Sequence, residues 1–183
     1  MNYGVNTYGA DMFKEQESAG LGRTIIRVKL KEEEGLVTCL EAMIDEEPTT
    51  EDFEDLRRSH LAQVKRSKLL DVSRYDISDE VNGFKVNGKR IWLDKATRVG
   101  LVNSLNIEKG TGKEITTLWL DDISYTLPIE NALELLSQVE LYAIACYNKT
   151  AEHRMAITNL TTPEDVETFD ITAGYPEQPS FVI

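Results

Sequence analysis

Apolar and polar residues alternate along residues 24–30 and again along residues 36–44, and this period of two predicts a β-hairpin. The acidic stretch 31–35 between them is expected to form the turn. Residues 1–22 show no sustained period and interleave four glycines with aromatic residues. They are therefore predicted to form an extended arm, and an arm of this kind needs another surface to hold it in place.

A helix is predicted over residues 51–72, because Pro48 ends the strand pattern and Thr49 or Thr50 can cap the helix. Its apolar residues follow a loose seven-residue spacing within a highly charged sequence. A stripe this narrow favours a coiled-coil or docking helix over a core helix. The apolar positions are Phe53, Leu56, Leu61, Val64 and Leu69.

Two further hairpins are predicted in the middle of the chain. Residues 83–86 and 89–93 flank Asn87-Gly88, a pair that favours the two left-handed residues of a type I′ turn. Residues 114–127 alternate on both sides of Asp121-Asp122 and predict the second hairpin. Both tryptophans are expected to pack in the core from these strands. They are Trp92 and Trp119.

Three helices are predicted around these hairpins. Asp94 can cap a helix that runs to about Lys109, and Pro128 can begin a long helix that persists to Asn159. Thr162 can cap a short helix that begins at the next residue. The expected buried face of the long helix consists of Ala132, Leu133, Leu136, Val139, Ala143, Cys146 and Tyr147.

These elements predict an α+β fold in which two antiparallel β-hairpins pack on a long C-terminal helix. An N-terminal strand and helix extension and extended terminal arms complete it. The predicted parts are an arm at 1–22, a hairpin with the charged helix at 23–74, a compact α+β domain at 75–170, and an extended tail at 171–183.

Aromatic residues in the two arms are the predicted partner-binding residues, because an extended arm cannot bury an aromatic ring without a partner. They are Tyr3, Tyr8, Phe13, Tyr175 and Phe181.

The charge balance opposes some partners. The chain has 32 acidic and 20 basic residues and a formal net charge of −12, which disfavours binding to nucleic acid and to anionic lipid. The basic residues within 57–68 follow acidic residues on the same predicted helix, an order that the helix dipole favours. The longest apolar run, residues 141–147, is far shorter than a membrane span, and no secretory signal is present. The chain is expected to be soluble and to be made in the cytoplasm.

No reaction can be argued from the candidate reactive residues. His60 and His153 have no serine or cysteine in a strained turn near them in the sequence. Cys39 and Cys146 are far apart within apolar segments, so they are expected to be reduced, buried thiols. We therefore expect no catalytic, metal-binding or cofactor-binding residue, no cofactor and no small-molecule substrate.

Several segments, in order and with similar spacing, resemble an uncharacterised domain found in tail-region and other virion proteins of phages and prophages of gut Bacteroidales bacteria. Related domains occur in tail-fibre-associated proteins of other phages. The resemblance covers roughly residues 57–180 and leaves residues 1–50 outside it. The segments that carry it are 66–76, 92–98, 117–119, 142–147 and 172–177.

The resemblance implies a non-enzymatic structural component of a bacteriophage virion, such as a connector, fibre-attachment or decoration protein of tail or head. Its expected partners are other virion proteins and copies of itself, and its expected location is the virion, after assembly in the host cytoplasm. A tail-fibre assembly chaperone is the first alternative. A tail-associated cell-wall or glycan hydrolase is the third reading, which needs two carboxylates facing across a cleft.

Overall fold

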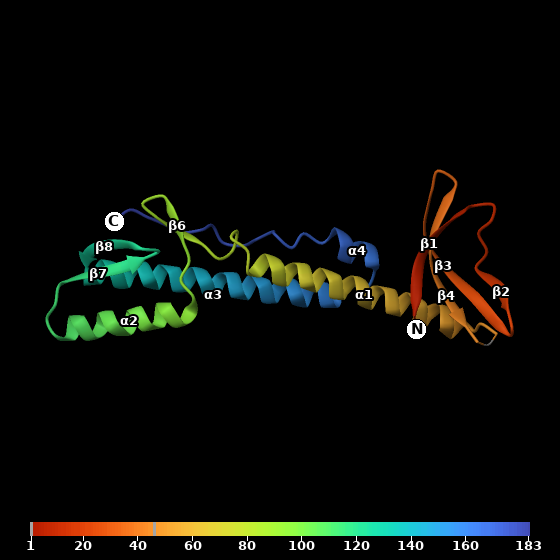
Figure 1. The fold of residues 1–183 in the computed structure, drawn as a ribbon, viewed down its shortest axis with the longest axis horizontal. Helices are drawn as coiled ribbons and strands as arrows, with labels where there is room; N and C mark the ends of the chain where they lie inside the picture. The colour runs from red at the N-terminus through yellow and green to blue at the C-terminus, as the bar shows by residue number, and fades with distance from the viewer. Residues whose placement is uncertain (1, 46) are drawn as a thin grey trace. The chain divides into compact units, whose positions relative to one another are not determined.

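The computed structural model describes residues 2–45 and 47–183 and divides the chain into two units (Figure 1). The first unit comprises Met1–Lys68 and Leu160–Phe169, and the second comprises Leu69–Asn159 and Asp170–Ile183. Helices and antiparallel sheets occur together in one chain, so the predicted α+β class is confirmed.

A four-stranded antiparallel sheet forms most of the first unit, in the order β1-β4-β3-β2. The strands are β1 (Tyr3–Gly9), β2 (Gln16–Gly20), β3 (Arg23–Glu33) and β4 (Leu36–Ile44). The β3–β4 hairpin confirms the prediction for residues 24–44.

The prediction of an extended arm at residues 1–22 is wrong, because this segment supplies both edge strands of the sheet. β1 pairs with β4 from Tyr3↔Ala42 to Gly9↔Leu36, and β2 pairs with β3. Backbone hydrogen bonds to a neighbouring strand hold an edge strand, so it needs no alternating apolar side chains of its own. That is why no period is visible in the sequence there.

Helix α1 (Thr50–Asp76) packs its first turns on this sheet. Thr49 and Asp52 form a reciprocal cap at its start, since the Thr49 amide donates to the Asp52 carboxylate at 2.8 Å. Leu56 is fully buried, so this part of α1 is a core helix of the first unit, which corrects the docking-helix prediction there. The buried core residues of this unit include Ile26, Val28, Leu40, Ala42 and Leu56.

The short helix α4 (Pro163–Thr168) also belongs to the first unit. Thr162 caps it as predicted, accepting a hydrogen bond from the Asp165 amide at 3.1 Å. The boundaries of the two units thus differ from the predicted parts: 160–169 lies outside the second unit, and 69–74 lies inside it.

Both predicted central hairpins are present in the second unit. They are β5 (Phe84–Val86) with β6 (Lys89–Ile91), and β7 (Ile115–Leu120) with β8 (Ile123–Pro128). The φ angles are 48° at Asn87 and 80° at Gly88, as a type I′ turn requires. The C-terminal segment adds strand β9 (Ser180–Phe181), which runs parallel to β5.

Helices α2 (Lys95–Gly110) and α3 (Ile129–Asn159) complete the second unit, and their bounds agree closely with the prediction. Asp94 caps α2 by accepting a hydrogen bond from the Thr97 amide at 2.9 Å. The main core contains residues of both hairpins and of both helices. Its fully buried members include Phe84, Val86, Ile91, Leu120, Ala132, Leu136 and Val139.

Two predicted core residues are instead on the surface. Trp119 is 68% exposed because it points to the outer face of the two-stranded β7–β8 sheet, of which only the inner face is covered. Tyr147 is 70% exposed, and Ala143 is only half-buried. The buried face of α3 runs through Tyr142, Cys146 and other residues on the side of the helix away from Tyr147. Within the described part of the chain, no helix has the length and apolar character that a membrane span needs.

Candidate functional site

Four of the five aromatic residues predicted to bind partners contact their own chain. The Tyr3 hydroxyl donates to Gln63 Oε1 at 2.6 Å, and its ring lies edge-on to that of His60 with centroids 5.9 Å apart. Phe181 lies edge-on to Phe84, with centroids 6.0 Å apart. These contacts remove the physical reason for the prediction, because the rings find partners within their own units.

Tyr175 is held in the same way. Its ring is 5.3 Å from that of Tyr75, and its hydroxyl lies 2.8 Å from Thr150 Oγ1. Tyr8 belongs to the polar network described next. Phe13 is half-buried in the loop between β1 and β2. The partner-binding role of these five residues stays a prediction.

A network of charged groups centres on Arg27 in the first unit. Its side chain is only 5% exposed and lies over the Tyr8 ring, with the guanidinium carbon 4.6 Å from the ring centroid. Arg27 Nε donates to Glu41 at 2.6 Å, and Nη1 donates to Glu17 at 3.1 Å. Burial alone would lower the pKa of Arg27, but hydrogen bonds with Glu41, Tyr8 and Glu17 raise it above its usual value.

Both oxygens of the Glu41 carboxylate accept hydrogen bonds in this network. Arg27, Tyr8 and Asn6 donate to its carboxylate. Burial raises the pKa of Glu41, but the hydrogen bonds from Tyr8 and Arg27 outweigh it and lower the pKa below the usual value. A carboxylate held ionised by three donors is a poor general acid. The network therefore stabilises the sheet and supplies no reactive group.

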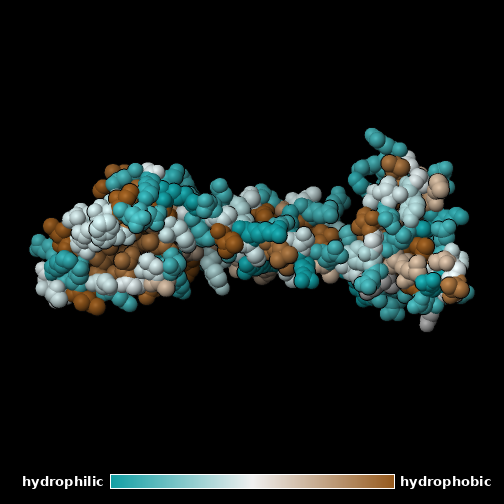
Figure 2. Space-filling view, in the orientation of Figure 1, coloured by the Kyte–Doolittle hydropathy of each residue, from teal (hydrophilic) through white to brown (hydrophobic). Residues whose placement is uncertain are grey.

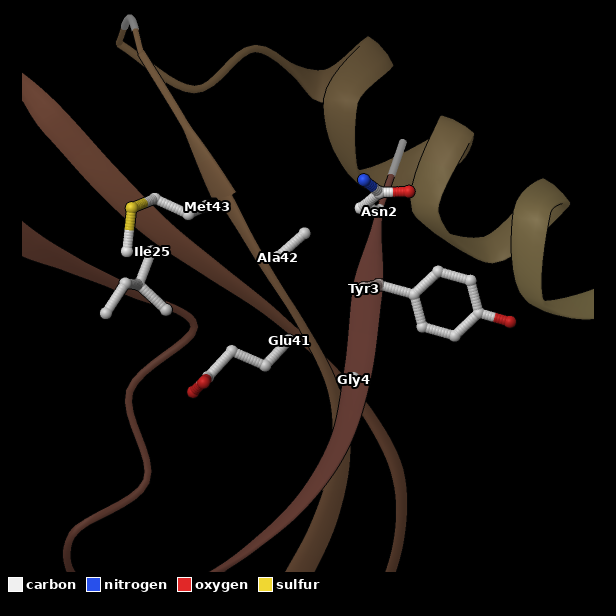
Figure 3. A pocket seen from close by; sticks show the side chains of 7 residues that line it. All are labelled: Asn2, Tyr3, Gly4, Ile25, Glu41, Ala42 and Met43. Atoms are coloured by element: carbon white, nitrogen blue, oxygen red, sulfur yellow. The ribbon is translucent and has the colours of Figure 1, made fainter.

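A depression of about 260 Å³ lies beside this network on β1, β3 and β4. Figure 3 shows Tyr3 pointing towards α1, while Glu41, Ile25 and Met43 lie on the other side of the strands. Glu41 is the only charged residue in its lining, and the donors named above already engage it. This depression offers a ligand little chemistry beyond apolar contact.

A second polar cluster attaches the C-terminal segment to α3 in the second unit. His153 Nε2 donates to the Ala173 carbonyl at 2.9 Å, and Thr150 donates to Asp76 at 2.6 Å. Cys146 is buried beside this cluster, and burial raises the pKa of its thiol, which keeps the thiol protonated at neutral pH. A protonated, buried thiol is a weak nucleophile, so the arrangement is structural. Among residues 2–45 and 47–183, no group of three or more His, Cys, Asp or Glu side chains is placed to hold a metal ion.

Helix α3 presents a third feature, which concerns one of its faces. Helix α2 runs antiparallel beside the first part of α3. Lys109 Nζ lies 2.8 Å from the Glu130 carboxylate near one end of the contact, and Arg98 Nε lies 2.6 Å from Glu140 at the other. Leu133, between these glutamates, packs against the core.

Beyond Glu140, α3 exposes large apolar side chains on the side opposite its buried residues. Positions seven apart on a helix share a face, so the exposed polar residues Glu134 and Ser137 precede Leu141 and Ile144 on this side. We call the apolar part of this side the open face. It consists of Leu141, Ile144, Tyr147, Asn148, Ala151 and Met155, of which Leu141, Ile144, Tyr147 and Met155 are 69%, 54%, 70% and 64% exposed.

Large apolar side chains on a continuous helix face are unusual on a surface without a binding role. Figure 2 shows hydrophobic side chains reaching the surface in the part of the molecule that contains α2 and α3. The sequence prediction missed this site because it assigned Tyr147 to the core. The available signal was the 3-4-3-4 spacing of residues 141, 144, 148, 151 and 155.

Comparisons of the chain with protein-family models, with curated proteins and with solved structures find no match. The resemblance of residues 57–180 to a phage virion domain therefore stays a prediction from the sequence.

Proposed function

We propose that the protein is a structural component of a bacteriophage particle, a connector, fibre-attachment or decoration protein, and that it acts through protein–protein contacts. The resemblance of residues 57–180 to virion proteins supports the assignment to a phage particle. The open face of α3 carries the proposed mode of action, because it is an extended apolar surface on a rigid helix.

The state of the reactive groups also supports a role in binding. The buried thiols have raised pKa values, and the buried ionic groups Arg27 and Arg98 are paired with carboxylates. Ionic side chains that pair with one another in this way stabilise the fold. The open face is then the principal surface feature that a partner could recognise.

Mass spectrometry of purified phage particles tests the proposal. The expected result is the protein in the particles at a fixed ratio to the other virion proteins. Its absence from particles, when it is present in the lysate that produced them, would contradict a structural role. A complex with fibre protein in that lysate would then assign it as an assembly chaperone.

A further inference from the structure

The outer side of β1 is an edge of the sheet in the first unit. β1 stands at one end of the strand order β1-β4-β3-β2, and no strand in the described part of the chain pairs with its outer side. The backbone amides and carbonyls that point outward there can bond with water or with a further strand. The β1 edge can therefore accept an added strand.

The two edges of this sheet differ in how they are protected against such pairing. β2 has five residues, carries Glu17 and is interrupted by a register shift between Ser18 and Gly20, and each of these features hinders the addition of a strand. β1 has seven residues in one continuous register, without a charged residue, a proline or a shift. In a chain of which 28% of the residues are charged, β1 is the edge suited to strand pairing.

An apolar side chain is also left uncovered at this edge. Val5 lies opposite the fully buried Leu40, on the face of the sheet that α1 covers, yet Val5 is 56% exposed. A strand added beside β1 would place a side chain next to Val5 and extend the buried face.

We propose that this added strand is β1 of a second copy of the chain. The two strands pair antiparallel about a two-fold axis that passes through Asn6 perpendicular to the sheet, so that the two sheets become one. This inference names a partner within the proposed role in protein–protein contact, but it rests on β1 and is independent of the open face.

The sequence of β1 complements itself in this arrangement. The axis at Asn6 pairs all seven residues of the strand, with Tyr3 of one copy opposite Gly9 of the other. Gly4 is then opposite Tyr8, so each tyrosine has a glycine across from it and no two large side chains are directly opposed. An isologous interface requires a patch of this self-complementary kind.

The remaining pairs agree with the same arrangement. Val5 of each copy lies opposite Thr7 of the other, and two β-branched residues form a favourable cross-strand pair. Each copy has a net charge of −12, so two copies repel each other unless they meet where charge is absent or paired. β1 contributes no charge, and the Glu41 carboxylate to which Asn6 donates is paired with Arg27.

The two α1 helices do not collide in this dimer. α1 contacts β1 at its first residue, where the Tyr3 hydroxyl donates to Gln63 and the Tyr3 ring contacts His60. Tyr3 lies three residues from the axis at Asn6, so the two copies of this contact are about 20 Å apart along the joined strands. Packed helices need about 8–10 Å between their axes, so both helices fit on the same face of the joined sheet.

Disulfide cross-linking of the full chain tests the pairing and its direction. A mixture of Val5→Cys and Thr7→Cys proteins should form a disulfide-linked dimer of one copy of each under mild oxidation. Either variant alone should cross-link poorly, because identical positions lie diagonally about 7–8 Å apart, beyond the reach of a disulfide. The native cysteines are both buried and should contribute little. Efficient cross-linking of Val5→Cys with itself, as parallel pairing would give, or none in the mixture, would overturn the proposal.

Sedimentation equilibrium of variants supplies a second test. One strand pair buries less than the ~800 Å² per partner of a standard interface, so we expect the wild-type dimer to dissociate in the micromolar range. Val5→Lys should weaken association by at least about tenfold, because a lysine on an edge strand opposes pairing. Ser18→Lys is the matched control, since it places the same charge at an exposed position of the other edge strand and should leave association unchanged.

Both lysine variants should remain folded, because both positions are exposed. A wild-type monomer at all concentrations, or equal association of the two variants, would overturn the dimer. Either result would leave the particle test of the proposed function unaffected.

Discussion

The two units of the chain are stabilised in different ways. In the first unit a four-stranded sheet buries a small apolar cluster on one face and places the Arg27 network on the other. In the second unit one continuous apolar core joins two hairpins to α2 and α3. An ionic network depends on pH and on every one of its partners, whereas an apolar core depends on how completely it is packed. The two units should therefore respond to different perturbations.

The largest loss of stability is expected from truncation in the apolar core of the second unit. Leu136 is 1% exposed, so Leu136→Ala should lower the free energy of unfolding by about 3–5 kcal/mol through lost burial and a cavity. Leu141→Ala makes the same change on the same helix at a 69% exposed position, where a loss below about 0.5 kcal/mol is expected. Denaturant unfolding at a concentration where the chain is monomeric measures both. Equal losses would show that α3 is not divided into a covered and an open part.

The next largest effect is expected in the first unit. Arg27→Leu leaves the Glu41 carboxylate without its charged donor, which should lower stability by about 3 kcal/mol. The double variant Arg27→Leu with Glu41→Leu should recover part of this loss, because the unpaired carboxylate is removed. If the single and the double variant lose the same free energy of unfolding, the network contributes through packing alone.

Acid should affect the first unit through the same residue. The folded-state pKa of Glu41 lies below the ordinary value of 4.5, so the unfolded chain takes up the proton first as the pH falls. The stability that this ionised carboxylate contributes is fully present above pH 4.5 and is lost as the pH falls through the folded-state pKa. The difference in unfolding free energy between wild type and Glu41→Gln should thus shrink between pH 5 and pH 3 (rough limits). A constant difference from pH 7 down to pH 3 would contradict the assignment.

The smallest effects are expected at two glycines of the second unit, and with opposite signs. Gly88 has a φ of 80° in the β5–β6 turn, so Gly88→Ala should cost about 1 kcal/mol. Gly100 lies on the exposed side of α2 with no atom near the position of an added methyl group, so Gly100→Ala should stabilise by about 0.5–1 kcal/mol. Thermal unfolding of both variants checks the signs, and a loss at Gly100 would show that its position is not open.

Local signals in the sequence were sufficient to predict much of the fold. The Asn87-Gly88 turn, the Asp94 cap and the Thr162 cap each act on neighbouring residues, so a short sequence specifies them. The edge strands β1 and β2 could not be predicted in this way, because their hydrogen bonds come from strands distant in sequence. The aromatic contacts of Tyr3 and Tyr175 were missed for the same reason.

The candidate site was predictable only in part. The spacing of residues 141–155 identifies an apolar face, but whether that face is core or surface depends on which sides of α3 the other elements cover. Such coverage comes from contacts between distant positions, as the pairing of Arg98 with Glu140, 42 positions apart, illustrates. A sequence pattern alone cannot place such a contact, so Tyr147 was assigned to the core.

The proposed function requires that the open face of α3 holds the protein in a particle. Its most direct test is quantitative mass spectrometry of phage particles produced with Ile144→Glu protein or with Ile107→Glu protein. We expect Ile107→Glu to be incorporated like the wild type and Ile144→Glu to be strongly depleted from particles while it remains folded in the lysate. Equal incorporation of the two variants would contradict it.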